Sequence, residues 1–476
     1  MKKIIYVIVY CITLVFLSCE SNLEETPLGF LEESNSFITA EDANSAISAV
    51  YHRLRGVYGM NMINLADLNG DECEARGESA LGNELHRNLF NSGTAIFNTF
   101  YTASYVLIDR ANRVIENVPK VMMDEQERMM IVAEARFLRA LTYFNLVRAF
   151  GDVPAVKQVT NDVIDVDISR ASVDEIYALI IEDLTVAETD LPLNYMEADR
   201  IGRATSGAAK ALLAKVFLTR GEWHNAAGKA KEVIDLGVYD LFPDYRSVFL
   251  PEEKNGIEHI FSVQYSCALP QYGSSMAVNF AIFFSYPINQ GGGSYQVTPR
   301  HAESYIPGDY RKEVTVIYEK RRADGSVVES RTGPHMDKYW DPLACGPSSA
   351  RNNFIVLRYA DVLLMYAEAL NELNGPTVEA YWAINKIRER ARNGNSGSHL
   401  FDLQGLTQAE FREAVLQERS WELCFEGHRR WDLLRTDTYI TKKTAGGVVA
   451  EEKHLLYPIP TIQMDVNSAL VQNPGY

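Results

Sequence analysis

A long helical pattern between about Asp124 and Phe150 constrains the fold of this 476-residue chain more than any other feature. Apolar residues recur there at spacings of three and four, which places them on one helix face: Ala133, Phe137, Ala140, Leu141, Phe144 and Val147. Gly151 supplies the stop. Further helices are predicted at about 39–55 and 103–117, and from the capping box Ser172-Val173-Asp174-Glu175 to about Leu191. Helical patterning therefore dominates the chain.

Two stretches have the spacing of tetratricopeptide helical hairpins, in which small residues allow two helices to pack closely. In residues 204–237, Leu213, Ala214 and Phe217 precede a turn at 220–222, and the second helix carries Ala226, Ala230 and Val233. In residues 358–392 the turn is Asn374-Gly375-Pro376. The whole chain does not repeat at a fixed period, so a regular solenoid is not expected. We predict an all-α fold of tetratricopeptide-like hairpins, an α-α superhelix, with long loop-rich insertions and minor β-structure.

The insertions lie at about 56–100 and 240–354 and are rich in Gly, Asn, Tyr and Phe. Short strand-like runs occur at 257–265 and 313–320, a hairpin turn is expected at Ala323-Asp324-Gly325-Ser326, and Gly291-Gly292-Gly293 indicates a mobile loop. Long loops on a rigid scaffold usually carry binding. Their aromatic side chains suit stacking on a sugar ring or gripping a peptide, although packing is commoner for any one of them. They are Tyr58, Phe90, Phe97, Tyr101, Tyr265, Tyr272, Tyr286, Tyr295, Tyr339 and Trp340.

The N-terminus has the parts of an export signal: Lys2-Lys3, an apolar run from Ile4 to Leu17, and Ser18-Cys19. The run is shorter than the roughly 20 residues that cross a bilayer. Cleavage before Cys19 would leave a cysteine that can carry lipid and anchor the chain to a membrane surface, and plain secretion is the alternative. We predict a signal peptide at 1–18, a lipidated acidic tether at 19–38, a helical region at 39–240, and a C-terminal region at 241–476 whose ligand-binding segment is 241–354.

The charge balance and the cysteine spacing limit the functions that this chain can have. The chain has 46 basic and 63 acidic residues, a net charge of −17, with no basic run, which argues against nucleic acid as a partner. Outside the signal and Cys19, the cysteines Cys73, Cys267, Cys345 and Cys424 form no C-x-x-C pair. Each is interpreted as a lone thiol, although an oxidising compartment permits disulfides.

No chemical motif stands out. The run Asp67-x-Asn69-x-Asp71 with Glu78 is similar to a calcium loop, but Glu72 stands where such a loop needs glycine, so no metal and no cofactor are predicted. G-x-S-x-G, H-E-x-x-H and Walker loops are absent from the sequence. An exported glycosidase would need two carboxylates across a cleft, and no local pattern selects such a pair. No catalytic residue is predicted.

The C-terminal third carries a dense pattern of charged and apolar residues. Thr407-x-x-Glu410 caps a helix that continues through Glu418-Arg419-Ser420-Trp421-Glu422-Leu423-Cys424-Phe425-Glu426 and stops at Gly427. Arg429-Arg430-Trp431-Asp432-Leu433-Leu434-Arg435 follows. Arg419 can pair with Glu422 one turn on, and the charges beside apolar residues predict a partly buried, structural ion network.

This pattern resembles the signature of the SusD/RagB family of outer-membrane nutrient-binding lipoproteins. Glu134 to Ala140, Phe150 to Pro154, Arg358 to Leu364 and the closing Gln472-Asn473-Pro474-Gly475-Tyr476 are also similar to family motifs. The resemblance implies an all-α lipoprotein facing the cell exterior. It implies capture of oligosaccharides, or of peptides in the RagB branch, for a TonB-dependent transporter of the SusC type, with no chemistry on the ligand.

The resemblance does not locate the ligand site, because the family binds with variable loops. From loop position we predict ligand contacts at Asn83, His86, Tyr272, Tyr295 and Trp340. Glycan capture is the first hypothesis. An oligopeptide binder, an exported glycosidase and a purely structural interaction module follow in that order.

Overall fold

The computed structural model describes residues 37–476, apart from 78–79, 160–166, 270–271, 283–291, 323 and 347–348. The predicted signal peptide, Cys19 and most of the tether lie outside the described residues, as do Glu78, Tyr286, Gly291 and Ala323. Within the described part of the chain, no helix is both long enough and apolar enough to cross a membrane.

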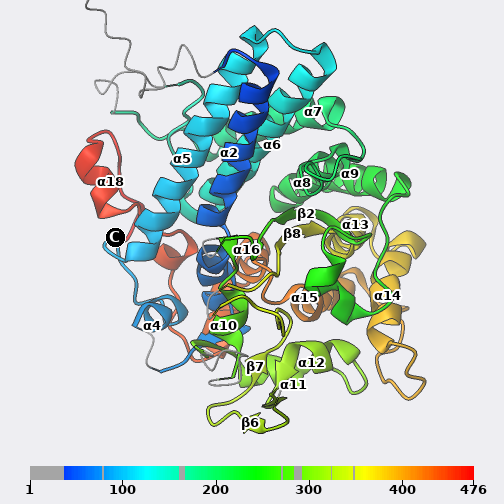
Figure 1. The fold of residues 1–476 in the computed structure, drawn as a ribbon. Helices are drawn as coiled ribbons and strands as arrows, with labels where there is room; N and C mark the ends of the chain where they lie inside the picture. Colours follow the sequence, from blue (N-terminus) through cyan, green and yellow to red (C-terminus); the bar gives the residue numbers. More distant parts are fainter. Residues whose placement is uncertain are drawn as a thin grey trace, which may run out of the picture.

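Helices pack side by side in chain order and form a superhelix (Figure 1). The packed series is α2 (Ala40–Val57), α5 (Ala95–Asn117), α6 (Glu125–Phe150), α7 (Val173–Asp190), α8 (Ser206–Thr219), α9 (Trp223–Asp235), and then α13 (Tyr359–Asn374), which contacts α9, α14 (Val378–Arg392) and α15 (Gln408–Leu423). The predicted hairpins are α8–α9 and α13–α14, and α13 against α9 joins them although they lie far apart in sequence. The prediction of an all-α fold with minor β-structure is confirmed.

Helix starts follow the capping chemistry of the sequence. Thr39, Ser172 and Thr407 each form a reciprocal capping box with the acidic residue three positions on, as predicted. The helix expected from about Ala103 begins instead at Ala95, because Ile96, Phe97 and Phe100 are buried on its first turns. The run at 313–320 is also not all strand. Asp309 caps a short helix, α12 (Tyr310–Thr315), before extended backbone begins.

Among the described residues, four antiparallel strand pairs lie in the insertions and at their edges. β1 (Cys73–Ala75) pairs with β3 (Tyr295–Val297), and β2 (His259–Val263) with β8 (Phe354–Arg358). β4 (Val316–Ile317) pairs with β7 (His335–Met336), and β5 (Glu319–Arg321) with β6 (Val327–Glu329). The β5–β6 hairpin turns where predicted, and Arg322 N donates to Ser326 O at 2.8 Å. The other elements are α3 (Met60–Met62), η2 (Ile63–Leu68), α4 (Ala80–His86), η3 (Val118–Lys120), η5 (Tyr245–Phe249), η6 (Pro251–Glu253), α10 (Met276–Phe280), α11 (Pro299–Ser304), α16 (Arg429–Arg435), α17 (Tyr439–Ala445), η8 (Glu452–Leu455) and α18 (Thr461–Val466).

The end of α15 differs from the sequence prediction. The helix ends at Leu423, and Gly427 lies in the turn that leads to α16, not at the helix stop. Gly427 has φ +81°, and a Cβ there would lie 2.8 Å from Met62 Cγ and 3.0 Å from Phe354 Cζ. The left-handed conformation and the close approach both require glycine.

Two of the four cysteines do not remain thiols. Cys267 and Cys345 form a disulfide across 78 residues of sequence, with their Cα atoms 5.8 Å apart. The lone-thiol interpretation is therefore wrong for this pair, whose long-range proximity no local spacing could reveal. Cys73 and Cys424 are buried free thiols, as predicted.

Candidate functional site

A cavity of about 680 Å³ opens in the loop-rich segment at the end of the molecule that carries β6 and β7 (Figure 1). Three parts of the chain form it: Arg76 after β1, Ile282 after α10, and the β5–β6 hairpin with the segment that leads to β7. Its lining is Arg76, Ile282, Arg322, Val327, Val328, Glu329, Ser330, Arg331, Thr332 and His335.

Short strands hold these parts together. Arg76 N donates to Ser294 O at 2.9 Å and so continues the β1–β3 ladder. Val297 N in β3 donates to Pro334 O at 3.0 Å, which joins β3 to the segment before β7. Because β4 pairs with β7, both ends of the excursion that contains the β5–β6 hairpin are fixed. The cavity walls therefore stand on hydrogen-bonded backbone.

A directed chain of hydrogen bonds forms one wall. His335 Nδ1 lies 3.0 Å from Phe280 O, which can only accept, so Nδ1 carries the proton. His335 Nε2 then accepts from Gln296 Nε2 at 3.1 Å, and the same amide nitrogen donates to Thr332 Oγ1 at 2.6 Å. Burial lowers the pKa of His335, and the guanidinium of Arg76 lowers it further, so the imidazole is neutral. The direction of the chain leaves the Thr332 hydroxyl proton as its last donor.

None of the five predicted contact residues lines this cavity. Asn83 and His86 lie on α4, which packs against β1, and Asn83 is partly exposed. Burial lowers the pKa of His86 to about 4, and the nearby positive charge of Lys443 contributes to the decrease. Tyr295 lies in β3 beside Gln296, is only 6% exposed, and burial raises its pKa to about 12.

Tyr272 and Trp340 lie elsewhere on the loop-rich side. The guanidinium of Arg55 in α2 stands 4.4 Å from the Tyr272 ring centroid, and His52 meets that ring edge-on at 5.5 Å. Lys320 Nζ stands 4.2 Å from the Trp340 ring centroid. The structure therefore brings Asn83, His86 and Tyr295 onto neighbouring elements and leaves the other two apart. Ligand contact by these five residues stays a prediction.

Sequence reasoning missed the residues that line the cavity. Arg76, Arg322, Arg331 and Thr332 belong to no motif, and Gln296 and His335 come together only through strand pairing. The one available signal was the hairpin turn at 323–326, which the sequence located correctly. Charged and hydroxyl residues flank that turn on both sides.

The residues of the calcium-loop pattern serve the fold. Asp67 Oδ2 accepts from Gly427 N at 2.9 Å, Asn69 donates to Asn88 Oδ1 at 2.8 Å, and Asp71 pairs with Arg429 at 2.6 Å. No group of three His, Cys, Asp or Glu side chains placed to hold a metal occurs among the described residues.

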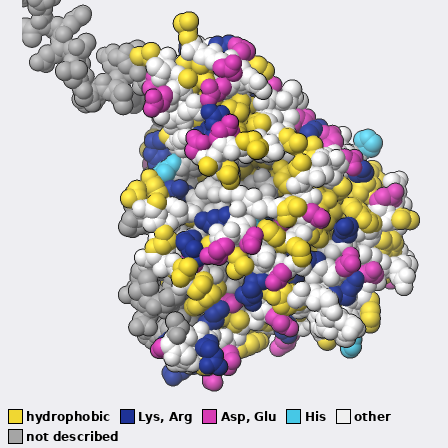
Figure 2. All heavy atoms as spheres, turned by 45° about the vertical axis from the view of Figure 1, so that its right-hand side comes forward, with side chains coloured by type: hydrophobic (Ala, Val, Ile, Leu, Met, Phe, Trp, Pro, Cys, Tyr) yellow, Lys and Arg dark blue, Asp and Glu magenta, His cyan; other side chains and the backbone are white. Residues whose placement is uncertain are grey.

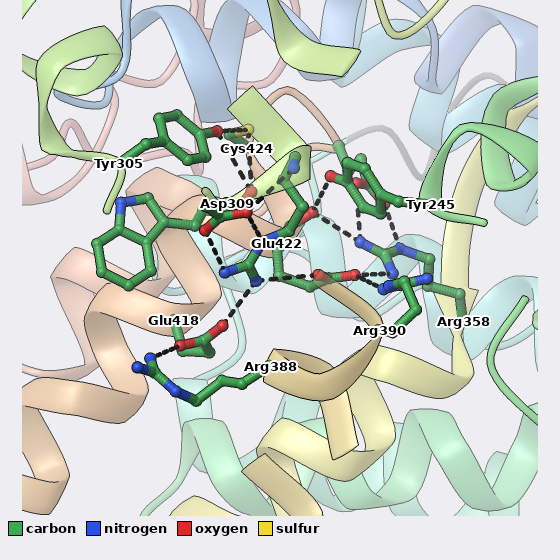
Figure 3. Close-up of polar contacts among 12 residues, drawn as sticks. Tyr245, Tyr305, Asp309, Arg358, Arg388, Arg390, Glu418, Glu422 and Cys424 are labelled. Atoms are coloured by element: carbon green, nitrogen blue, oxygen red, sulfur yellow. Dashed lines mark hydrogen bonds and ion pairs between the residues drawn. The ribbon is translucent and has the colours of Figure 1, made fainter. Parts of the chain in front are cut away.

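The C-terminal signature builds a buried ion network (Figure 3). Its members are five cations and five carboxylates: Arg311, Lys338, Arg358, Arg388 and Arg390 with Glu258, Asp309, Glu418, Glu422 and Glu426. Burial alone would raise the pKa of Glu422, but its guanidinium neighbours hold it far below the ordinary value. Charges that are fully paired in the interior have a structural role, as predicted.

The predicted Arg419–Glu422 pair does not form. Arg419 instead pairs with Asp361 and Asp432, each at 2.8 Å, while Glu422 is engaged by Arg358 at 2.6 Å. Both residues lie on α15, but each finds a closer partner on another element. Lys215 of α8 also reaches Asp361 at 2.8 Å, which ties the first hairpin to the signature.

Comparison with known proteins identifies the scaffold. A protein of Formosa agariphila named SusD-like protein P2 is 30% identical over 510 residues, which cover 100% of both chains. The chain belongs to the SusD family. A family model described as "SusD family" matches residues 272–476, and one described as "Starch-binding associating with outer membrane" matches residues 29–218.

Solved SusD structures share the fold over nearly the whole chain. A SusD superfamily protein from Parabacteroides distasonis has a TM-score of 0.81 and 28% identity, covering 92% of this chain and 99% of its own. A structure described as a laminarin-binding SusD-like protein has a TM-score of 0.77 and 26% identity, covering 92% of this chain and 100% of its own. The superhelix and its loop-rich side are thus shared SusD architecture.

Proposed function

We propose that the protein captures oligosaccharides at the cell surface and passes them to a SusC-type, TonB-dependent transporter in the outer membrane. The observation that carries the proposal is SusD family membership together with a roomy polar cavity beside the β5–β6 hairpin. The laminarin-binding relative supports a sugar ligand.

The cavity has the groups that sugar binding needs. Apolar side chains of Ile282, Val327 and Val328 can meet the C–H face of a sugar ring, and the Thr332 hydroxyl can donate to a ring oxygen or hydroxyl. Asn83, Tyr272 and Trp340, which are partly exposed, are proposed as further contacts along a longer chain. Such an open site binds weakly enough to release its ligand to a transporter.

Binding without chemistry fits the cavity better than hydrolysis. A glycosidase needs two carboxyl groups about 5–10 Å apart across its cleft. Among the described residues that line the cavity, Glu329 is the only carboxylate. We therefore propose a carrier that leaves its ligand unaltered.

Isothermal titration against a broad oligosaccharide panel tests the proposal. At least one member should bind with a Kd between micromolar and millimolar, and products should be absent after long incubation. If no oligosaccharide of the panel binds and a protein digest does, the protein is an oligopeptide carrier instead. Turnover of a labelled glycan would replace the proposal by an exported glycosidase.

The anchor is proposed at Cys19. The wild-type protein should fractionate with outer membranes and be accessible to protease added to intact cells. Cys19→Ala should move it to the soluble fraction without changing the affinity for sugar. A Cys19→Ala variant that stays in the membrane fraction would contradict lipid anchoring.

A further inference from the structure

A second cavity, of about 530 Å³, lies where the helical scaffold meets the segment that follows the C-terminal signature. We call it the α16 cavity, because α16, near the centre of the molecule in Figure 1, forms part of its wall together with residues of α6, α7, α8, α17 and η8. It shares no lining residue with the cavity beside the β5–β6 hairpin. Its charged and aromatic lining includes Arg148, Tyr177, Trp431, Arg435, Asp437 and Glu452.

Most of the remaining lining of the α16 cavity is apolar. Leu434, Ile440, Leu455 and Leu456 line it and are partly buried. Small-molecule sites commonly have volumes of about 300–1,000 Å³ and mainly hydrophobic walls with a few polar groups. The size and the walls of the α16 cavity therefore suit a small ligand with an apolar body.

Arg148 brings a positive charge to this apolar wall. Its guanidinium carbon stands 3.9 Å from the ring centroid of Phe144 and 4.9 Å from that of Trp431. Nε donates to Phe144 O at 3.1 Å and Nη2 to Asn145 Oδ1 at 2.6 Å, while Nη1 has no hydrogen-bond partner among the described residues. Burial lowers the pKa of Arg148 to about 10, so the group remains charged at neutral pH.

No carboxylate among the residues that the structure describes forms an ion pair with Arg148. Asp432 and Asp361 act on it only from beyond ion-pair distance, and each already pairs with two other cations at 2.8–2.9 Å. Arg435, the other lining guanidinium, pairs with Asp432 and Glu368. In the described lining, Arg148 is therefore the cation that lacks an anionic partner.

The surroundings of Arg148 differ from those of the surface cations. On the face drawn in Figure 2, Lys and Arg side chains lie among Asp and Glu side chains and in contact with water. Arg148 is only partly exposed and is covered by aromatic rings. Because the local dielectric is lower there, an anionic group that reaches Arg148 gains more than it would at the surface.

Two further donors of the lining have no acceptor among the described residues. They are the Tyr177 hydroxyl and the buried Nε1 of Trp431. Burial raises the pKa of Tyr177 to about 12, so its hydroxyl keeps its proton, and the charge of Arg148 acts on it. Donors that lack acceptors, one of them a guanidinium, match a ligand group that accepts hydrogen bonds and is negatively charged, such as a carboxylate.

Two lining carboxylates limit the charge that a ligand can carry. Asp437 and Glu452 are exposed, and neither pairs with Arg148. Water weakens their field, but they still repel a ligand that carries several negative charges. The lining therefore favours a ligand with a single anionic group, placed next to the guanidinium of Arg148.

We propose that the α16 cavity binds a small amphipathic carboxylic acid, a compound with one carboxylate on an apolar body. Arg148 binds the carboxylate through its free Nη1, and the Tyr177 hydroxyl donates a second hydrogen bond to it. The aliphatic side chains of the lining contact the apolar body. This site gives the protein a second ligand at a separate place and does not depend on the function proposed above.

Isothermal titration of the full chain at pH 7 with three probes of one shape tests the site. The probes are 4-phenylbutanoate, 4-phenylbutan-1-ol and 4-phenylbutylamine, which differ in the charge of one end. The acid should bind at least tenfold more tightly than the alcohol, and the amine should bind most weakly. Absence of binding, equal affinities of acid and alcohol, or tightest binding of the amine would overturn the inference.

Two variants tie the binding to named groups. Arg148→Met removes the charge and keeps an unbranched side chain against the aromatic rings, so the affinity for the acid should fall at least tenfold and that for the alcohol should not change. Tyr177→Phe removes only a hydroxyl that has no partner in the described part of the chain. It should fold like the wild type and bind the acid about threefold more weakly, which keeps the test decisive if Arg148→Met does not fold.

Arg220→Gln is the matched control. Its guanidinium stands 4.8 Å from the Tyr177 ring centroid but lies outside the cavity lining. The affinity for the acid should not change in this variant. Thermal unfolding verifies that each variant folds. Losses in Arg220→Gln as large as those in the two lining variants would show that general electrostatics, and not this cavity, sets the preference, and would overturn the inference.

Discussion

Two regions of the molecule contain several arginines, and they differ in how far the guanidinium groups are withdrawn from solvent. In the buried network of the C-terminal signature, five cations meet five carboxylates, and Arg358 alone contacts Glu258, Glu422 and Glu426 at 2.6–2.7 Å. In the cavity beside the β5–β6 hairpin, Arg76 and Arg322 are partly exposed and Arg331 is exposed. Residue type alone therefore says little about role. Burial separates the arginines of the core from those that line the cavity.

The physical reason lies in desolvation. A charge taken out of water stays charged only if its partners replace the lost hydration, so an interior network must close on itself. Groups that stay in contact with water are not under that constraint. The comparison predicts a large loss of stability when an arginine is removed from the core and a small change when one is removed from the cavity.

The largest effect is expected in the core. Arg358→Met should reduce the free energy of unfolding by about 3–5 kcal/mol, because three buried carboxylates, those of Glu258, Glu422 and Glu426, each lose a cationic partner. Chemical denaturation measures the change. Arg331→Met is the matched control at the exposed cavity and should stay within about 0.5 kcal/mol of the wild type. Similar losses for both variants would abolish the distinction between the two regions.

A third group of charges, around Arg429, contains more buried carboxylates than cations. Glu72 and Asp71 share Arg429, and Ser420 donates to Glu72 at 2.6 Å. Burial raises the pKa of Glu72 to about 8, against an ordinary value near 4.5. The folded protein then holds this proton more tightly than the unfolded chain does. This contribution to stability is complete below about pH 4 and is lost as the pH rises toward 8.

Glu72→Gln cannot ionise, so the variant does not lose stability as the pH rises toward 8. The amide oxygen of the new side chain still accepts the hydrogen bond from Ser420. The variant should be more stable than the wild type by about 2 kcal/mol at pH 8.5 and nearly equal to it at pH 4.5. Denaturation at the two pH values measures the difference. A variant that is less stable at pH 8.5 would show that Arg429 needs both carboxylates charged.

Local signals predicted most of the scaffold. Capping boxes at Thr39, Ser172 and Thr407 fixed three helix starts, and small residues such as Ala226 and Ala230 located the hairpins. These features depend on residues a few positions apart, where propensity and periodicity act. The ion network was also expected from charges beside apolar residues, but Arg419 chose Asp361 and Asp432 over Glu422.

Neither the cavity nor the disulfide could be predicted from local sequence patterns. Cys267 meets Cys345 across 78 residues, and Arg76 reaches the β5–β6 hairpin only because β1 pairs with β3 and β3 contacts the segment before β7. Short strands of two or three residues have too little pattern to specify their partners. Aromatic residues were therefore chosen by loop position, while the lining proved to be cationic and hydroxylic.

The smallest effect is expected at Thr332, the last residue of the hydrogen-bond chain in the cavity wall. In the core, hydrogen bonds close on protein groups. At Thr332 the chain from Phe280 through His335 and Gln296 ends in a hydroxyl group on an exposed residue. Thr332→Val keeps the shape of the side chain and removes this donor. Ligand affinity should fall about fivefold, equivalent to about 1 kcal/mol, for anionic and neutral sugars alike, because a hydroxyl does not recognise charge.

The stability of Thr332→Val should remain within about 0.5 kcal/mol of the wild type, because Thr332 is exposed and the amide of Gln296 keeps its hydrogen bond to His335 Nε2. Paired titration and denaturation of the same preparation measure both quantities. Ser326→Ala is the control, since it removes a hydroxyl from an exposed residue of the same hairpin that is outside the cavity lining. If Thr332→Val destabilises the fold and leaves affinity unchanged, the hydrogen-bond chain has a structural role, and the contrast between buried core and exposed cavity does not extend to uncharged groups.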